Sequence, residues 1–214
     1  MSTVSTAFEK AAAEGGAALV GYLPAGFPTV DWAIEAAAAM AESGADVVEI
    51  GLPYSDPLMD GPVIQEAVHR ALAGGTKVTD VLRTVEAVAA VGVPVLVMTY
   101  WNPVDHHGVD RFARELAGAG GAGLITPDLP PEEAGDWLAA SDTHGLDRVF
   151  LVAPSSTGQR VATITRACRG FVYAASLMGI TGTRDAVSGD ASGLVKRIRE
   201  LTSELSLGVR RTAP

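Results

Sequence analysis

Short apolar runs alternate with helical segments along most of the chain. The runs are rich in β-branched residues, and the segments between them carry helix start and stop signals. Because the runs are apolar on both faces and each is separated from the next by a helix, the pattern predicts parallel strands covered by helices. The six predicted strands are residues 18–23, 46–52, 93–100, 122–129, 148–154 and 171–177.

The helical segments are bounded by capping residues, prolines and glycines. Thr29 is a predicted N-cap and Gly44 the matching stop. Thr6 and Glu9 have the spacing of a capping box, which predicts a short helix at the start of the chain. The other helices are predicted over residues 29–44, 62–75, 78–92, 109–120, 131–145, 157–170 and 190–204.

The loops are polar and rich in proline and glycine after the strands, whereas the turns before the strands are tight. Doubly wound sheets and (β/α)8 barrels both fit this alternation. In a barrel, chemistry gathers at the carboxyl ends of the strands. The loop asymmetry therefore predicts a working face that carries Glu49, Tyr100, Asn102, Asp128 and Thr181.

Composition narrows the class of protein. Of the 214 residues, 48% are hydrophobic, and 25 acidic residues against 16 basic ones give a net charge of -9. This balance argues against nucleic acid as the main partner, because phosphate binding needs clustered Lys and Arg. The single cysteine, Cys168, excludes a disulfide framework within the chain. No apolar stretch has the length of a signal peptide or a membrane span, so we expect a cytoplasmic protein.

Two carboxylates stand out in "VVEIGLPYSDPLMDGP", residues 47–62. Glu49 interrupts an apolar strand, where burial disfavours the ionised form and raises the pKa of the acid towards working pH. A structural role, as a buried acid paired with Lys or Arg, is about as common as a functional one for such a position. Asp60 lies on the polar loop before a glycine, and taken alone it is better explained as a turn residue.

The sequence resembles the tryptophan synthase alpha chain family through five motifs that occur in the family's order. They are "GYLPAGFP", "VVEIGLPYSDPLMDGPVIQ", "TYWNPVDHHGVDRF", "ITPDLPPEE" and "YAASLMGITGTR". The resemblance implies a (β/α)8 TIM-barrel fold. It also implies a lyase of tryptophan biosynthesis, which cleaves indole-3-glycerol phosphate to indole and glyceraldehyde 3-phosphate by a retro-aldol reaction.

The resemblance assigns roles to individual residues. Glu49 matches the family's catalytic glutamate and Asp60 the aspartate near the indole N–H. The remaining matches are residues expected to bind substrate, Tyr22, Tyr100, Tyr173, Thr181 and Gly182, and residues expected to face the partner chain, Pro53, Asp56 and Asn102. For any single tyrosine, partial burial in the core is the commoner explanation.

The implied partner is a tryptophan synthase beta chain in an alpha2-beta2 heterotetramer, and pyridoxal phosphate is expected only on that partner. No cofactor or metal is predicted for this chain. His106 and His107 are adjacent on a loop and have no spaced Cys, Asp or His residues to complete a site. Cys168 is predicted to be a core residue rather than a nucleophile.

The chain departs from the family near its end. After the sixth helix the family has two more β/α units, whereas here "LGV" begins a seventh strand and "RRTAP" follows. Of the family's phosphate site, only Gly182 is recognised. We therefore expect one domain, residues 1–214, with about six of eight β/α units. We also expect unpaired edges on the first and sixth strands, and weak or absent lyase activity.

Two other functions are compatible with the sequence. A non-catalytic partner of the beta chain would dock through residues 53–60 and 100–109 without turning over substrate. Another phosphate-binding barrel, such as an isomerase or an aldolase, is the second alternative. A lysine-dependent aldolase is disfavoured, because Lys10, Lys77 and Lys196 all map to helices or helix starts rather than strand ends.

Overall fold

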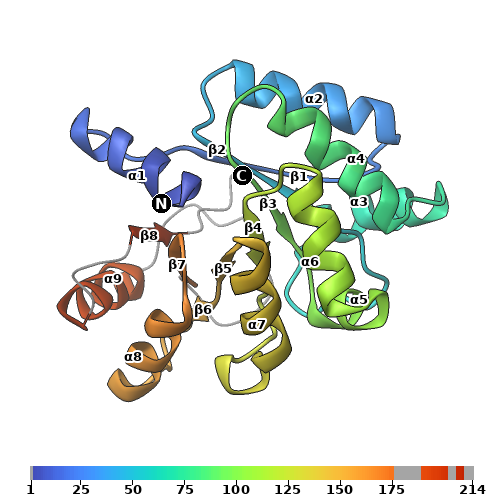
Figure 1. Cartoon of the computed structure of the whole chain (residues 1–214). Helices are drawn as coiled ribbons and strands as arrows, with labels where there is room; N and C mark the ends of the chain where they lie inside the picture. Colours follow the sequence, from blue (N-terminus) through green and yellow to red (C-terminus); the bar gives the residue numbers. More distant parts are fainter. Residues whose placement is uncertain (1, 176–188, 202–205, 210–214) are drawn as a thin grey trace.

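Parallel strands form a curved sheet that is surrounded by helices in the computed structural model (Figure 1), which describes residues 2–175, 189–201 and 206–209. One sheet has the order β1-β2-β3-β4-β5 and the other the order β6-β7-β8, with every pairing parallel. A single residue, Phe150, separates β5 from β6, so both belong to the predicted strand 148–154. The strands are β1 (Val20–Pro24), β2 (Val47–Gly51), β3 (Val95–Met98), β4 (Gly123–Ile125), β5 (Asp147–Val149), β6 (Leu151–Val152), β7 (Phe171–Ala174) and β8 (Ser206–Val209).

The predicted seventh strand is confirmed as β8, which pairs with β7 from Phe171↔Ser206 to Ala174↔Val209. The expectation that the sixth predicted strand has an unpaired edge is therefore wrong. A run as short as "LGV" suffices because β7 offers it a complete ladder of backbone groups. Among the described residues, β1 is paired on one side only, with β2.

The helices follow the predicted segments closely, with one addition. Thr29 accepts a hydrogen bond from the Trp32 backbone N–H, which confirms it as the N-cap of α2. The additional helix is α5, in a segment for which the sequence predicts a loop. The helices are α1 (Thr3–Ala13), α2 (Val30–Glu42), α3 (Pro62–Ala73), α4 (Val78–Ala89), α5 (Trp101–His107), α6 (Val109–Gly118), the 3-10 turn η1 (Pro131–Glu133), α7 (Gly135–His144), α8 (Gly158–Ala167) and α9 (Gly189–Leu201).

The first helix begins earlier than the predicted capping box. Ser2 is its N-cap and accepts a hydrogen bond of 3.1 Å from the backbone N–H of Ser5, whereas the Thr6 hydroxyl donates to the Ser2 carbonyl. Both residues have capping chemistry, and the upstream serine adds a further turn to the helix.

The hydrophobic core has two layers, one on each face of the sheet. Side chains such as Val48 and Ile50 pack outward against the helices, while Val47 faces inward. The inner layer consists of Val47, Leu96, Met98, Ile125, Val149, Phe171 and Tyr173, joined by Val4 of α1. Phe8 of α1 stacks on Phe171 with ring centroids 5.2 Å apart, so α1 closes the inner face at the amino ends of the strands.

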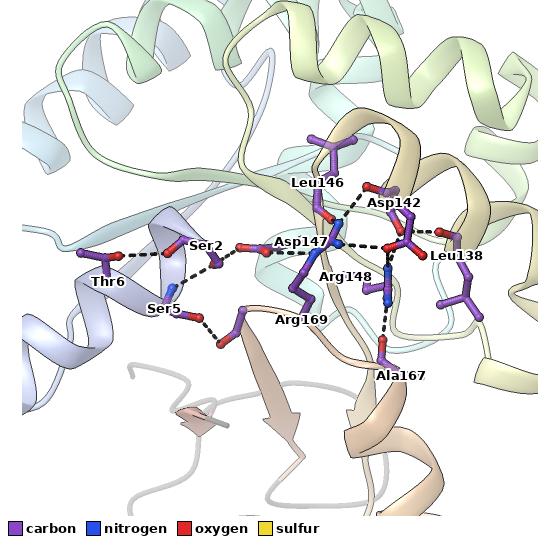
Figure 2. Close-up of polar contacts among 12 residues, drawn as sticks. Ser2, Ser5, Thr6, Leu138, Asp142, Leu146, Asp147, Arg148, Ala167 and Arg169 are labelled. Atoms are coloured by element: carbon purple, nitrogen blue, oxygen red, sulfur yellow. Dashed lines mark hydrogen bonds and ion pairs between the residues drawn. The ribbon is translucent and has the colours of Figure 1, made fainter. Parts of the chain in front are cut away.

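Polar contacts fix α1 to this end of the sheet (Figure 2). The Ser2 hydroxyl donates to the Asp147 carboxylate, and the Ser5 hydroxyl donates to the Gly170 carbonyl at 3.2 Å. Burial raises the pKa of Asp147, against the opposing effects of the Ser2 hydrogen bond and the charges of Arg169 and Arg148. The amino end of the sheet is thus occupied by structural contacts.

Two arginines extend the same network to the ends of α7 and α8 (Figure 2). Arg148 donates to the Ser141 hydroxyl at 3.0 Å and to the Ala167 carbonyl at 2.7 Å. Arg148 and Arg169 both pair with Asp142, and these contacts, first that of Arg148, hold the pKa of that carboxyl below its ordinary value. The network joins elements that are distant in sequence and leaves the carboxyl ends of the strands for other roles.

Cys168 is buried beside this network and is expected to be chemically inert. Its sulfur accepts a hydrogen bond from the Phe150 backbone N–H at 3.4 Å, and burial raises the pKa of the thiol to about 12. Because the thiolate is the reactive form, we expect iodoacetamide to modify Cys168 at least ~10-fold more slowly in the native protein than in urea. Mass spectrometry of timed samples measures both rates, and equal rates would contradict the inference.

Candidate functional site

Glu49 lies in the middle of β2 and is buried, with 3% of its surface exposed. It pairs in register with Tyr22 on β1 and with Leu96 on β3. Successive strand residues face opposite sides, so Glu49 faces inward like Val47. The sequence-based expectation of a buried acid in an apolar strand is confirmed, and the acid lies on the same face as the inner core layer.

Tyr22 lies against the same part of β2. A Cβ added to Gly51, two residues beyond Glu49, would lie 2.4 Å from the Tyr22 hydroxyl oxygen and 2.9 Å from the ring carbon that carries it. The Tyr22 ring therefore lies over Gly51, and a side chain at this position would require the ring to move. This contact places an aromatic ring beside Glu49 at the carboxyl end of β2.

Asp60 is bonded to Tyr100 across two neighbouring loops. The Tyr100 hydroxyl donates to Asp60 Oδ1 at 3.2 Å and accepts from the Met59 backbone N–H at 2.9 Å. Burial raises the pKa of Tyr100, and the nearby Asp60 carboxylate raises it further, although the Met59 hydrogen bond opposes both effects. The hydroxyl therefore remains protonated and able to donate at neutral pH.

Two further residues support this pair, and the sequence did not single them out. The Gln65 side-chain amide donates to the Asp60 carbonyl at 2.7 Å, and the Tyr54 ring lies 5.6 Å from the Tyr100 ring. Gln65 belongs to the first turn of α3, directly after the loop. A polar side chain at such a position is the only signal in the sequence that points to it.

Asp128 joins a third loop to the same region. Its carboxylate oxygens accept from the Trp101 backbone N–H at 3.0 and 3.1 Å, at the start of α5. Tyr100 is the N-cap of α5 but makes no side-chain capping bond. Asp128 therefore supplies the cap that α5 lacks, which explains why a segment with loop-like sequence is helical.

The residues expected at a partner interface differ in exposure. Asp56 and Asn102 are exposed, whereas Pro53 is buried. Pro53 and Leu52 line a cavity of about 320 Å³ between the end of β2, α4 and α5. Asp56 and Asn102 are thus available to a partner, and Pro53 supports the loop from beneath.

Tyr173 lies on β7 and belongs to the inner core layer, with its ring 5.8 Å from that of Phe171. Thr181 and Gly182 lie outside the described residues. The structure thus brings Tyr22 beside Glu49, bonds Tyr100 to Asp60, and places Tyr173 on the same inner face as Glu49.

Metal ligation has no support within the described residues, where no group of three or more His, Cys, Asp or Glu side chains is arranged to hold an ion. His107 pairs with Glu115 at 2.8 Å. The hydrogen bonds from Arg111 and, to a lesser extent, His107 hold the pKa of Glu115 below its ordinary value. His106 is exposed. In the same part of the chain, no helix is long and apolar enough to cross a membrane.

The chemistry available at this end of the sheet is that of two carboxyl groups in unlike surroundings. Glu49 is enclosed by strands, and Asp60 is half-buried on a loop and bonded to a phenol. Unlike surroundings separate the pKa values of two acids and so allow one to transfer protons while the other stays ionised. The aromatic rings of Tyr22 and Tyr173 on the inner face suit a flat, apolar substrate.

Comparisons with known proteins agree on one family. The family model described as "Tryptophan synthase alpha chain" matches residues 8–209. The tryptophan synthase alpha chain of Salinispora arenicola is 63% identical over 209 residues, covering 98% of this chain and 78% of the relative. That of Mycobacterium avium is 59% identical over 208 residues, covering 97% of this chain and 76% of the relative.

Solved structures give the same result. A structure of Mycobacterium tuberculosis tryptophan synthase has a TM-score of 0.93 and 54% identity, and covers 97% of this chain and 79% of that chain. Tryptophan synthase subunit alpha from Legionella pneumophila has a TM-score of 0.86 and 32% identity, and covers 98% of this chain and 78% of that chain.

Proposed function

The chain belongs to the tryptophan synthase alpha chain family, and we propose from this premise that it acts as a lyase. The function of that family is the cleavage of indole-3-glycerol phosphate in tryptophan biosynthesis, on a TIM-barrel type of fold. The observation that carries the proposal for this chain is Glu49, a buried acid on the inner face of β2 beside Tyr22. Burying an ionisable group costs stability, and a role in proton transfer would account for the presence of an acid at this position.

Glu49 is assigned the proton transfers in this proposal. Its carboxylic acid gives a proton to indole C3, which leaves the ring as an indolenine with positive charge on nitrogen. The resulting carboxylate then takes the proton of the side-chain hydroxyl as the bond from C3 to the glycerol chain breaks. The bonding electrons return to the ring, the hydroxyl carbon becomes the aldehyde of glyceraldehyde 3-phosphate, and Glu49 regains its proton.

Asp60 is assigned the stabilisation of charge on the ring nitrogen. A carboxylate that accepts a hydrogen bond from the indole N–H becomes more favourable as that nitrogen turns positive. The hydrogen bond from Tyr100 to Asp60 Oδ1 supports this role, because a donor to a carboxylate favours its ionised form. Tyr22 and Tyr173 would flank the indole ring.

The proposed partner is a tryptophan synthase beta chain, which is supported by the similarity of this chain to chains in solved structures of tryptophan synthase. Asp56 and Asn102 are the proposed contact residues, with Pro53 beneath them. Two exposed apolar side chains lie close to Asp56 in sequence, Leu58 with 70% and Val63 with 74% of their surface exposed. Exposed apolar groups of this kind favour a protein interface over open solvent. Pyridoxal phosphate on the partner, and a cytoplasmic location, stay predictions.

The test is direct incubation with indole-3-glycerol phosphate. We expect the purified protein to release indole above the uncatalysed rate, measured by chromatography or a colour reaction for indole. Absence of indole release, both alone and with the beta chain, would overturn the proposal. The measured kcat also decides the separate expectation of weak turnover, which stays a prediction.

The second candidate is a non-catalytic partner of the beta chain, favoured by the exposed Leu58 and Val63. Under this alternative, the protein raises or lowers the activity of the beta chain without releasing indole itself. Glu49→Gln would then leave the effect on the beta chain unchanged.

A further inference from the structure

We infer that Tyr100 is a positioning residue that holds Asp60 in place, and that Asp128 fixes the start of α5 from which Tyr100 acts. This inference rests on the proposed function, because it deepens the role given to Asp60. It differs from the family-based expectation for Tyr100, which is direct contact with substrate.

The first step is the use of the Tyr100 hydroxyl. It accepts from the Met59 N–H at 2.9 Å and donates its single proton to Asp60 at 3.2 Å. These two bonds therefore go to consecutive residues of one loop. A hydroxyl already committed in this way has no proton left for a substrate atom.

The second step is the rigidity of the Tyr100 ring. Only 5% of the Tyr100 surface is exposed, and the ring lies 5.6 Å from that of Tyr54. Tyr54 and Asp60 belong to the same loop, so Tyr100 contacts this loop at two separated points. A half-buried loop carboxylate held at its side chain by Tyr100 and at its carbonyl by Gln65 loses much of its freedom.

The third step is the attachment of Tyr100 itself. The residue that follows it, Trp101, gives its backbone N–H to both oxygens of Asp128. Leu129, next to Asp128, is buried in the outer core layer and anchors that loop. The contacts thus run from the loop after β4 to α5, and from Tyr100 to the loop that carries Asp60.

Tyr100→Phe tests the inference because it removes only the hydroxyl. We expect kcat for indole release to fall ~10-fold with KM within about twofold, since Asp60 acts on charge that develops in the transition state. In an Asp60→Asn background, Tyr100→Phe should change kcat less than about twofold, because its effect passes through Asp60. A raised KM with unchanged kcat would show direct substrate contact and overturn the inference. The inference would also be overturned if Tyr100→Phe lowered kcat by the same ~10-fold in the Asp60→Asn background as in the wild type.

Asp128 is tested with a matched capping control. Asp128→Ala should lower kcat about threefold, and Asp128→Asn, which keeps an acceptor, should stay near wild type. Thr29→Ala removes the N-cap of α2. We expect it to lower the melting temperature by ~2–4 °C, as the loss of the Asp128 cap should, but without changing kcat. Equal kcat values for Asp128→Ala and Thr29→Ala would contradict the role of Asp128 in positioning Tyr100.

A readout without turnover separates this inference from the proposed function. Hydrogen exchange of the Met59 amide should accelerate ~10-fold or more in Tyr100→Phe, because its acceptor is lost. Unchanged exchange would overturn the positioning role even in an active enzyme. Accelerated exchange in a protein that releases no indole would support the positioning role and count against the lyase activity alone.

Discussion

Replacing Glu49 with glutamine is expected to lower kcat for indole release about a thousandfold, or to the uncatalysed background. Glutamine keeps the shape of the side chain but neither gives nor takes a proton at neutral pH. General acid–base catalysis contributes about 10²- to 10⁴-fold to a rate, and Glu49 is assigned both transfers in one cycle. Single-turnover measurement of indole release compares the two proteins.

The matched control for this variant is Glu42→Gln. Glu42 is the last residue of α2 and is exposed, so the same chemical change there should leave kcat unaltered. Circular dichroism of Glu49→Gln checks that the variant is folded. A kcat for Glu49→Gln within about tenfold of wild type would contradict the assignment of the proton transfers to Glu49.

Replacing Gly123 with alanine is expected to destabilise the protein by about 3 kcal/mol, the largest loss of stability that we predict. Gly123 begins β4 and pairs in register with Asp147 of β5. A Cβ at this position would lie 2.3 Å from the carbonyl oxygen of Asp147 and 2.7 Å from its carbonyl carbon. These are backbone atoms of a neighbouring strand, so no side-chain rotation relieves the clash.

The cost is increased by the contacts that Asp147 already makes. Its carboxylate holds Ser2 of α1 and lies 3.5 Å from Arg169, so moving β5 disturbs the network at the amino end of the sheet. Urea unfolding followed by circular dichroism measures the free energy of unfolding. Gly135→Ala is the control, because nothing lies within 4 Å of a Cβ there and alanine favours the helix α7. Equal free energies of unfolding for the two variants would contradict the prediction.

The alternation of strands and helices was predictable because each element carries its own pattern. Period and capping chemistry are local properties, and every strand among the described residues overlaps a run that the sequence identifies. The exception is α5, whose cap comes from Asp128, 27 residues further along the chain. A prediction of secondary structure from neighbouring residues cannot detect a contact between residues so far apart in sequence.

In the candidate site too, features set by local sequence were predictable, whereas contacts between distant residues were not. The burial of Glu49 follows from the apolar run around it, and its strand neighbours fix its direction. The bond between Tyr100 and Asp60 does not follow, because it joins two loops whose approach depends on the curvature of the sheet. The sequence predicted that Glu49, Tyr100 and Asp128 belong to one face of the protein, but not that Tyr100 bonds to Asp60.

The position of α1 over the amino end of the sheet has a consequence for where a substrate can bind. Phe8 stacks on Phe171 and Ser2 bonds to Asp147, so side chains of α1 cover the amino ends of β7 and β5. Under the proposed function, the substrate would therefore bind at the opposite end of the strands, where the loops that carry Asp56 and Asn102 lie. A partner bound to those loops would lie over the same end of the sheet as the substrate.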